Sequence, residues 1–169
     1  MKILVIGLGN PILTDDGVGV KVAYAVQEAL DVMVASNGSS ESGYLPSIDV
    51  TEACVGGLRL MEMMIGYDRV IIIDALTTVD APPGSIHRLA LPDLEEISPT
   101  QHSASAHDAS LVTALDSGRR MGLALPDDIS IYAVSVENII DFGDTPTPAV
   151  EQAIPLVTAA VLEELKQMS

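Results

Sequence analysis

The sequence predicts an α/β fold in which a mostly parallel sheet is covered by helices on both sides. Short runs of branched apolar residues alternate along the chain with longer segments of helical periodicity. The clearest run, Val70–Ile73, is typical of a strand buried on both faces at the centre of a parallel sheet. A length of 169 residues corresponds to one domain, which we expect to span residues 1–169.

The first half of the chain contains three predicted strands and two predicted helices. The strands are short and rich in branched residues, whereas Val18, Val22, Val26 and Leu30 give the first helix an apolar face. The Ser/Gly-rich segment 37–47 is typical of an exposed loop. The predicted strands are residues 3–7, 47–52 and 69–74, and the predicted helices begin near residue 18 and span 57–65.

The second half continues the alternation. A Pro-Pro-Gly turn at 82–84 precedes a predicted strand over 84–89, and residues 91–106 are polar and irregular. A helix over 107–120, a strand over 129–136 and a helix over 147–167 complete the pattern. The last helix has one apolar face, made by Val150, Ile154, Val157, Val161 and Leu165.

Charge and composition exclude several classes of protein. The chain has 8 Lys and Arg against 24 Asp and Glu, which gives a formal net charge of −16. A non-specific nucleic-acid binder needs clustered Lys and Arg, and an anionic membrane surface would repel this chain. Because 48% of the residues are apolar, the chain is not a disordered acidic tail. The apolar run 3–8 is too short for a signal peptide or a membrane helix, so we expect a cytoplasmic protein.

The glycine-rich segment Gly7–Gly19, after the first strand, carries two adjacent aspartates, Asp15 and Asp16. Either one would suit the cap of the following helix, because carboxylates are favoured near a helix N-terminus. A dinucleotide fingerprint is an alternative, but Ile12 replaces its third glycine and two aspartates would repel a pyrophosphate. In a third interpretation, one aspartate points into the crevice as a metal ligand.

Two further residues, Asp74 and His107, are expected near the same crevice, because sites in such folds form where the carboxyl ends of the strands meet. Asp74 follows four apolar residues, where a charge needs a partner or a metal, although a structural cap of the next loop is the alternative. His107 opens a predicted helix, unlike His87 and His102. One histidine and two aspartates form a donor set that suits Ni²⁺ or Zn²⁺.

Signatures of nucleophilic catalysis and of common zinc proteases are absent from the sequence. There is no Gly-x-Ser-x-Gly elbow and no His-Glu-x-x-His helix. The lone cysteine, Cys54, has no neighbouring group that would activate it, so we expect a buried small residue after a strand.

Three segments, taken in order, resemble the [NiFe]-hydrogenase maturation endopeptidases. The resemblance continues through Val134–Glu137 and the Thr147-Pro148 start of the last helix. It implies a three-layer α/β/α sandwich with a twisted, mostly parallel five-stranded sheet. The three segments are Gly7-x-Gly9-Asn10 with Asp15-Asp16-Gly17-x-Gly19, Ile72-Ile73-Asp74-Ala75, and Ser105-Ala106-His107-Asp108.

The resemblance also implies an activity and a set of site residues. Members of this family are endopeptidases that cut once near the C-terminus of the hydrogenase large-subunit precursor, after nickel insertion. Asp16, Asp74 and His107 match the family's three nickel-contacting positions, so they are the expected catalytic and metal-binding residues of an aspartic-type endopeptidase. The nickel is expected to arrive in the precursor rather than as a resident cofactor. No nucleic acid or membrane is expected as a partner.

One segment departs from the family pattern. Residues 52–55 are Glu-Ala-Cys-Val, where the family often has Asp-Gly-Gly-Thr, a position associated with substrate recognition or catalysis. Glu52, in this segment, and Asn10, in the first motif, are the candidates for substrate recognition. The departure also leaves an alternative function, a nickel-dependent checkpoint that binds the same precursor without cutting it.

Overall fold

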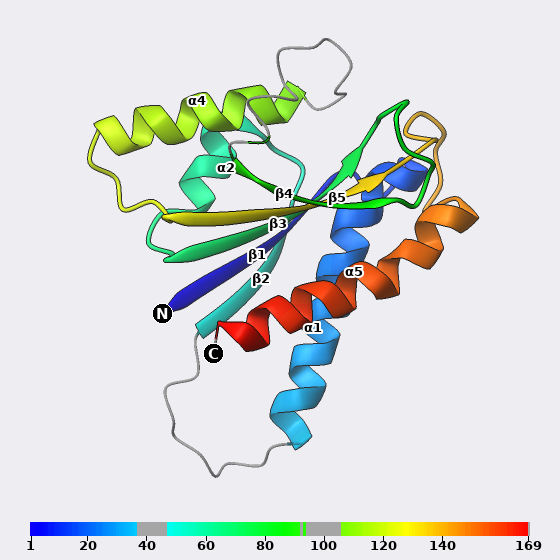
Figure 1. The fold of residues 1–169 in the computed structure, drawn as a ribbon, viewed down its shortest axis with the longest axis horizontal. Helices are drawn as coiled ribbons and strands as arrows, with labels where there is room; N and C mark the ends of the chain where they lie inside the picture. Colours follow the sequence, from blue (N-terminus) through cyan, green and yellow to red (C-terminus); the bar gives the residue numbers. More distant parts are fainter. Residues whose placement is uncertain (37–46, 92, 94–105, 169) are drawn as a thin grey trace.

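A five-stranded sheet forms the centre of the structure, a computed structural model that describes residues 1–36, 47–91, 93 and 106–168 (Figure 1). For residues 106–110 only the backbone is described. The strand order is β2-β1-β3-β5-β4, with four parallel strands and β4 antiparallel to β5 at one edge. This confirms the predicted fold class. The strands are β1 (Lys2–Leu8), β2 (Ser47–Ala53), β3 (Arg69–Leu76), β4 (Ile86–Ala90) and β5 (Asp128–Ser135).

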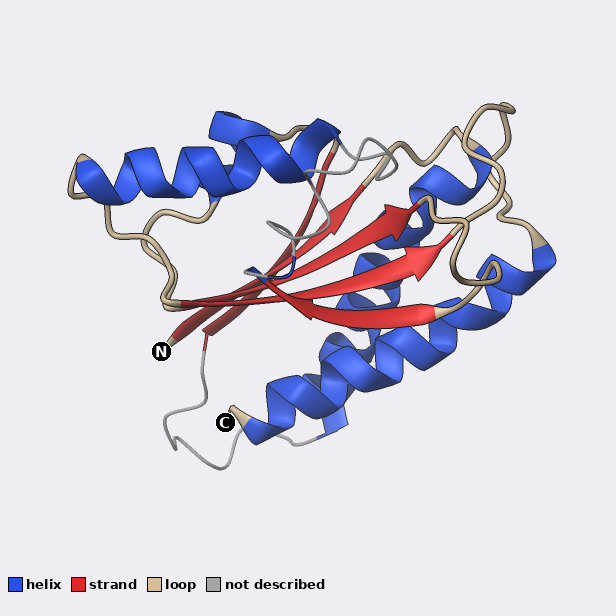
Figure 2. Ribbon diagram, turned by 45° about the horizontal axis from the view of Figure 1, so that its top comes forward, coloured by secondary structure: helices blue, strands red, loops and turns tan. Residues whose placement is uncertain are grey.

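Helices cover both faces of the sheet, which gives the three layers of an α/β/α sandwich (Figure 2). Helices α1 and α5 pack together on one face, and α2 and α4 pack together on the other. Among the described helices, none has the length and apolarity needed to cross a membrane. The helices are α1 (Val18–Ser36), α2 (Gly57–Met63), α4 (Ala106–Arg120) and α5 (Pro148–Gln167), with a short 3-10 helix, η1 (Thr14–Gly17).

Two apolar clusters fill the spaces between the sheet and its helix layers. Side chains of a strand point alternately to opposite faces, so Ile71 and Ile73 join the α1 and α5 cluster while Val70 and Ile72 join the α2 and α4 cluster. All four are buried, as the run of branched residues predicts for a central strand. On α2, the sequence spacing predicts an apolar face of Leu58, Met61 and Ile65, but only Met61 is buried. Leu58 and Ile65 are exposed, and Leu60 and Met64 pack on the core beside Met61 instead.

The predicted elements agree with the structure to within a few residues, because the apolar periodicity that predicts them is also what packs them onto the core. The last helix begins as predicted, with Thr147 at its N-cap and Pro148 in its first turn. Most of the two irregular segments expected at 37–47 and 91–106 lies outside the described residues.

Helix α1 begins very close to the carboxyl ends of β1 and β3, and Gly19 makes this possible. A Cβ atom at Gly19 would lie 2.3 Å from the carbonyl oxygen of Ile73 and 2.4 Å from that of Leu8. Any side chain would therefore push the helix away from the sheet. The glycine serves helix-strand packing, and it holds η1, with Asp16, directly above the end of the sheet.

Candidate functional site

A small pocket lies at the carboxyl edge of the sheet, where loops after β1, β2, β3 and β5 converge. Its volume is about 100 Å³. Two of the predicted site residues, Asp16 and Asp74, line it together although 58 positions separate them in the sequence. The structure thus brings these two carboxylates to one crevice. The lining residues are Leu8, Gly9, Asp16, Ala53, Cys54, Val55, Asp74, Ala75, Thr77 and Ile139.

Asp16 is held over the pocket by the loop that follows β1. The backbone N–H of Asn10 donates a hydrogen bond of 2.8 Å to the Asp16 carboxylate, and the N–H of Gly9 donates one of 3.1 Å to the Ala53 carbonyl. Gly9 has a φ of +127°, and a Cβ there would lie 1.9 Å from the backbone oxygen of Asp16. Only glycine fits this turn, which explains the second glycine of the Gly-x-Gly-Asn motif.

Asp15, the neighbour of Asp16, is completely buried and has a different role. Its carboxylate accepts hydrogen bonds from the backbone N–H groups of Glu137 and Asn138 at 3.2 and 3.0 Å. It also accepts bonds from the N–H and hydroxyl of Thr147 at 2.7 and 3.0 Å. Asp15 therefore joins η1 to the β5–α5 loop and to the start of α5, and Asp16 is the aspartate that faces the pocket.

Asp74 stands at the end of β3, half-buried, directly after the four apolar residues of the central strand. Its carboxylate accepts a hydrogen bond of 2.8 Å from the N–H of Ala75. The alternation of the strand places Asp74 on the same face as Val70 and Ile72, which is the face covered by α2 and α4. The Asp74 carboxylate thus both accepts a bond from the next residue of its own chain and lines the pocket.

His107 lies in the first turn of α4, and its side chain is outside the described residues. Helix α4 ends just before the start of β5 at the amino edge of the sheet, so its first turn lies toward the carboxyl edge (Figure 1). No group of three His, Cys, Asp or Glu able to hold a metal is found among the described side chains, a search that leaves out His107. The third ligand position stays a prediction.

Glu52 and Asn10 lie beside the pocket rather than in its lining. The Glu52 carboxylate accepts a hydrogen bond from the Tyr24 hydroxyl on α1, and this bond raises the pKa of Tyr24. The Asn10 side-chain oxygen accepts a bond of 3.2 Å from the N–H of Ile12. Both side chains have intramolecular partners in this structure, and their role in substrate recognition stays a prediction.

The observed position of Cys54 differs from the buried one that the sequence predicts, and it adds a residue to the site. We expected a buried side chain, but Cys54 is exposed and lines the pocket. It directly follows β2, and the chain turns away from the sheet there before α2 begins at Gly57. Thr77 and Ile139 were also missed, although both follow strand ends. The rule that sites form at carboxyl ends, applied to every strand, would have found all three.

Comparison with known proteins identifies a family. The family model described as hydrogenase maturation protease, HycI, matches residues 33–164 of this chain. The hydrogenase 2 maturation protease of Escherichia coli K12 is 28% identical over 167 residues, which cover 96% of this chain and 92% of that protein.

Solved structures show the same fold. The hydrogenase maturating endopeptidase HybD from E. coli superposes with a TM-score of 0.76 at 25% identity, covering 100% of this chain and 94% of that one. The [NiFe] hydrogenase maturation protease HybD from Thermococcus kodakarensis superposes with a TM-score of 0.66 at 20% identity, covering 98% and 99%.

Proposed function

Because the chain belongs to the hydrogenase maturation protease family and is an endopeptidase, we propose that it removes a C-terminal peptide from the precursor of a [NiFe]-hydrogenase large subunit. We propose further that the cut follows nickel insertion and that the metal in the precursor is the feature recognised. The observation that carries this proposal is the pair of carboxylates, Asp16 and Asp74, that share one pocket at the carboxyl edge of the sheet.

The donor chemistry of the pocket suits a divalent ion carried by the substrate. Asp16 and Asp74 supply carboxylate oxygens from two different loops, and His107 would add an imidazole nitrogen from the first turn of α4. Such mixed oxygen and nitrogen sets bind borderline ions, including Ni²⁺. In this proposal the nickel of the precursor docks on these residues and places the scissile tail at the pocket.

The same carboxylates supply what peptide hydrolysis requires. A water molecule attacks the scissile carbonyl, and an aspartate carboxylate at the pocket accepts its proton as general base. That proton then passes to the leaving amine, so the bond breaks without a covalent intermediate. The nickel of the substrate supplies positive charge that holds the tail in place. Asp16, held by the N–H of Asn10, and Asp74, held by that of Ala75, present carboxylates with restricted orientation.

The test is to replace each carboxylate by its amide. Asp16→Asn and Asp74→Asn keep the volume of the side chain and an acceptor oxygen for the local N–H bonds, but remove the charge. We expect each to slow processing of the nickel-loaded precursor by about 100-fold or more, with the midpoint of urea unfolding unchanged.

The matched control is Asp127→Asn, an exposed aspartate just before β5 at the amino edge of the sheet. It should process the precursor at the wild-type rate. Wild-type rates in both pocket variants would show that Asp16 and Asp74 do not act on the substrate.

A further inference from the structure

Four exposed apolar residues lie on the loops that follow β1, β3 and β5 at the carboxyl edge, the same loops that contribute to the pocket, and we call them the apolar rim: Ile12, Val79, Ile140 and Phe142. Their side chains are 55%, 96%, 82% and 83% exposed, respectively. Phe142 is the one phenylalanine of the chain, yet it lies on the surface rather than in the core. Exposed apolar groups gathered beside a binding pocket are typical of a surface that contacts another protein.

Two of the loops that carry the apolar rim, those after β1 and β5, are hydrogen-bonded to each other. The N–H of Gly143 donates a hydrogen bond of 3.0 Å to the carbonyl of Ile12, and the N–H of Thr14 donates one of 2.9 Å to the carbonyl of Gly143. The Thr14 hydroxyl also donates a bond of 2.6 Å to the carbonyl of Asp141. Segments 12–14 and 141–143 therefore form one unit, which presents Ile12 and Phe142 together.

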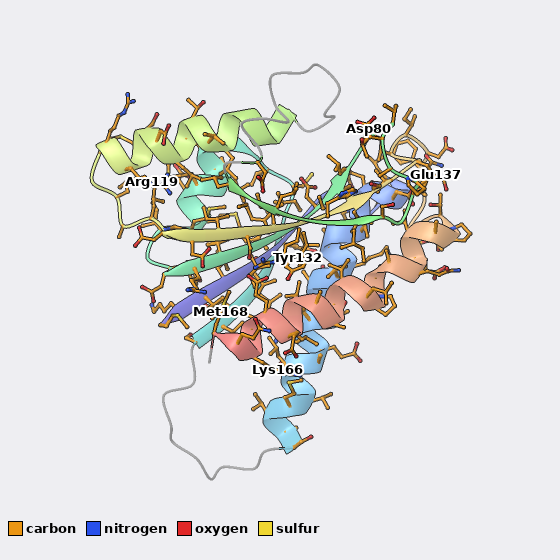
Figure 3. The ribbon with its side chains drawn as sticks, viewed as in Figure 1. Asp80, Arg119, Tyr132, Glu137, Lys166 and Met168 are labelled. Atoms are coloured by element: carbon orange, nitrogen blue, oxygen red, sulfur yellow. The ribbon has the colours of Figure 1, made fainter. Side chains whose placement is uncertain are left out.

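The surface around the apolar rim is acidic. The segments 9–17, 53–56, 74–85 and 136–147 contain no lysine or arginine. Asp80, Glu137, Asp141 and Asp144 are exposed in these segments. Figure 3 shows the labelled Asp80 and Glu137 at the same end of the molecule. A partner that fits this surface would carry an apolar patch bordered by lysine and arginine, because opposite charges across an interface favour association.

We propose that the apolar rim docks the folded body of the precursor while its C-terminal tail enters the pocket, an inference that rests on the proposed function. A pocket of about 100 Å³ is far smaller than the several hundred Å³ of typical ligand sites, so it holds only a small part of a peptide. Contacts outside the pocket would then add to the affinity that the nickel of the precursor provides. A second copy of this chain is disfavoured as the occupant, because it would bring like charges together.

The first experiment removes apolar surface from the rim. The double variant Ile140→Ser with Phe142→Ser should raise KM for the nickel-loaded precursor about tenfold or more, with kcat unchanged, because buried aromatic anchors dominate interfaces. The matched control is Met121→Ser with Leu156→Ser, two exposed apolar residues outside the rim. We expect the control to have the KM of the wild type.

The second experiment tests the charge. Stopped-flow association of the wild type with the precursor should slow as ionic strength rises. Asp80→Asn with Asp144→Asn should lower the association rate at low salt and weaken its dependence on salt. An association rate that salt and these substitutions leave unchanged would contradict the charge complementarity.

The outcomes separate this inference from the proposed function. If the wild type processes the precursor and the rim variant does so with unchanged KM, the docking proposal is wrong and the function stands. If the wild type does not cleave the precursor, the proposed function is wrong. Comparing how tightly the intact precursor binds the wild type and the rim variant then still tests the docking proposal. A wild-type dimer in sedimentation velocity that becomes monomeric in the rim variant would show that a second copy occupies the rim.

Discussion

At the scale of single residues, Asp15 and Asp16 show how adjacent carboxylates can have separate roles. Asp16 is half-buried and faces the pocket, whereas Asp15 is fully buried and accepts hydrogen bonds from the β5–α5 loop and from Thr147. A buried carboxylate is tolerated when its oxygens are fully hydrogen-bonded. Asp15 is thus the link that keeps η1, and Asp16 with it, fixed relative to α5.

This assignment predicts a loss of stability on removing the Asp15 carboxylate. Asp15→Ala leaves the N–H and hydroxyl of Thr147 without their buried acceptor, which should lower the free energy of unfolding by about 3 kcal/mol in a urea titration. Asp31→Ala, at an exposed position on α1, is the control and should change stability by less than about 0.5 kcal/mol. Equal stabilities for the two variants would contradict the role given to Asp15.

Some residue roles can be predicted from the sequence and others cannot. Asp16 and Asp74 are found because each follows a predicted strand, and the carboxyl ends of parallel strands meet. The partners of Asp15 are 122 to 132 positions away, so no local pattern contains them. Glu52 shares a strand face with Ile48 and Val50, which predicts its direction toward α1, but its bond to Tyr24 depends on how that helix docks.

At the scale of elements, α5 is joined to β4 and β5 by a polar network in which Glu164, Ser130 and Tyr132 are buried and Arg88 is exposed. Arg88 donates a hydrogen bond of 3.1 Å to the Glu164 carboxylate and forms an ion pair with it at 3.0 Å, and the hydroxyls of Ser130 and Tyr132 each donate a hydrogen bond of 2.6 Å. Figure 3 shows Tyr132 between the sheet and α5. Burial alone would raise the pKa of Glu164, but these bonds lower it below its ordinary value.

The network predicts that the stability of the fold decreases both in acid and in base. Because the pKa of Glu164 is lowered in the folded state, its contribution is full above its ordinary pKa and disappears as pH falls through the lowered value. Burial and the bond to Glu164 raise the pKa of Tyr132 to about 12, so its contribution is full below about pH 10 and disappears as pH rises toward 12.

Glu164→Gln tests the network. It should lower the free energy of unfolding by about 2 kcal/mol at neutral pH, and the loss relative to wild type should shrink as pH falls toward the lowered pKa of Glu164. Urea unfolding near pH 3, 7 and 11 measures this. Glu163→Gln, an exposed neighbour paired with Lys166 at 3.8 Å, is the control and should match the wild type. A constant difference at all pH values would show that the charge of Glu164 is not what stabilises the contact.

The helices and strands are well predicted by the sequence, because the periodic apolar residues that indicate each element are also the residues that it buries. The alternation of branched runs with helical segments predicts every described strand and helix of more than one turn to within a few residues. The strand order β2-β1-β3-β5-β4 and the antiparallel direction of β4 follow from long-range pairing, which no local pattern specifies. The order and the direction of β4 therefore come from the structure, because the family resemblance implies only a mostly parallel five-stranded sheet.

At the scale of the whole molecule, the fold places the candidate site residues at one end, the carboxyl edge of the sheet. Parallel strands deliver four loops to the carboxyl edge, Gly19 lets α1 begin close against β1 and β3, and Asp15 connects η1 to α5. The result is a pocket with two carboxylates inside an acidic surface that also carries the apolar rim. This arrangement suits the proposed removal of a C-terminal peptide from a folded precursor.

The most direct test of the account is intact-mass spectrometry of the nickel-loaded large-subunit precursor, incubated with and without this protein. The same precursor without nickel is the control. We predict that the nickel-loaded precursor loses a single C-terminal peptide only when the protein is present, and that the nickel-free precursor keeps its mass. An unchanged mass for the nickel-loaded precursor, or equal cleavage of both forms, would contradict nickel-dependent processing.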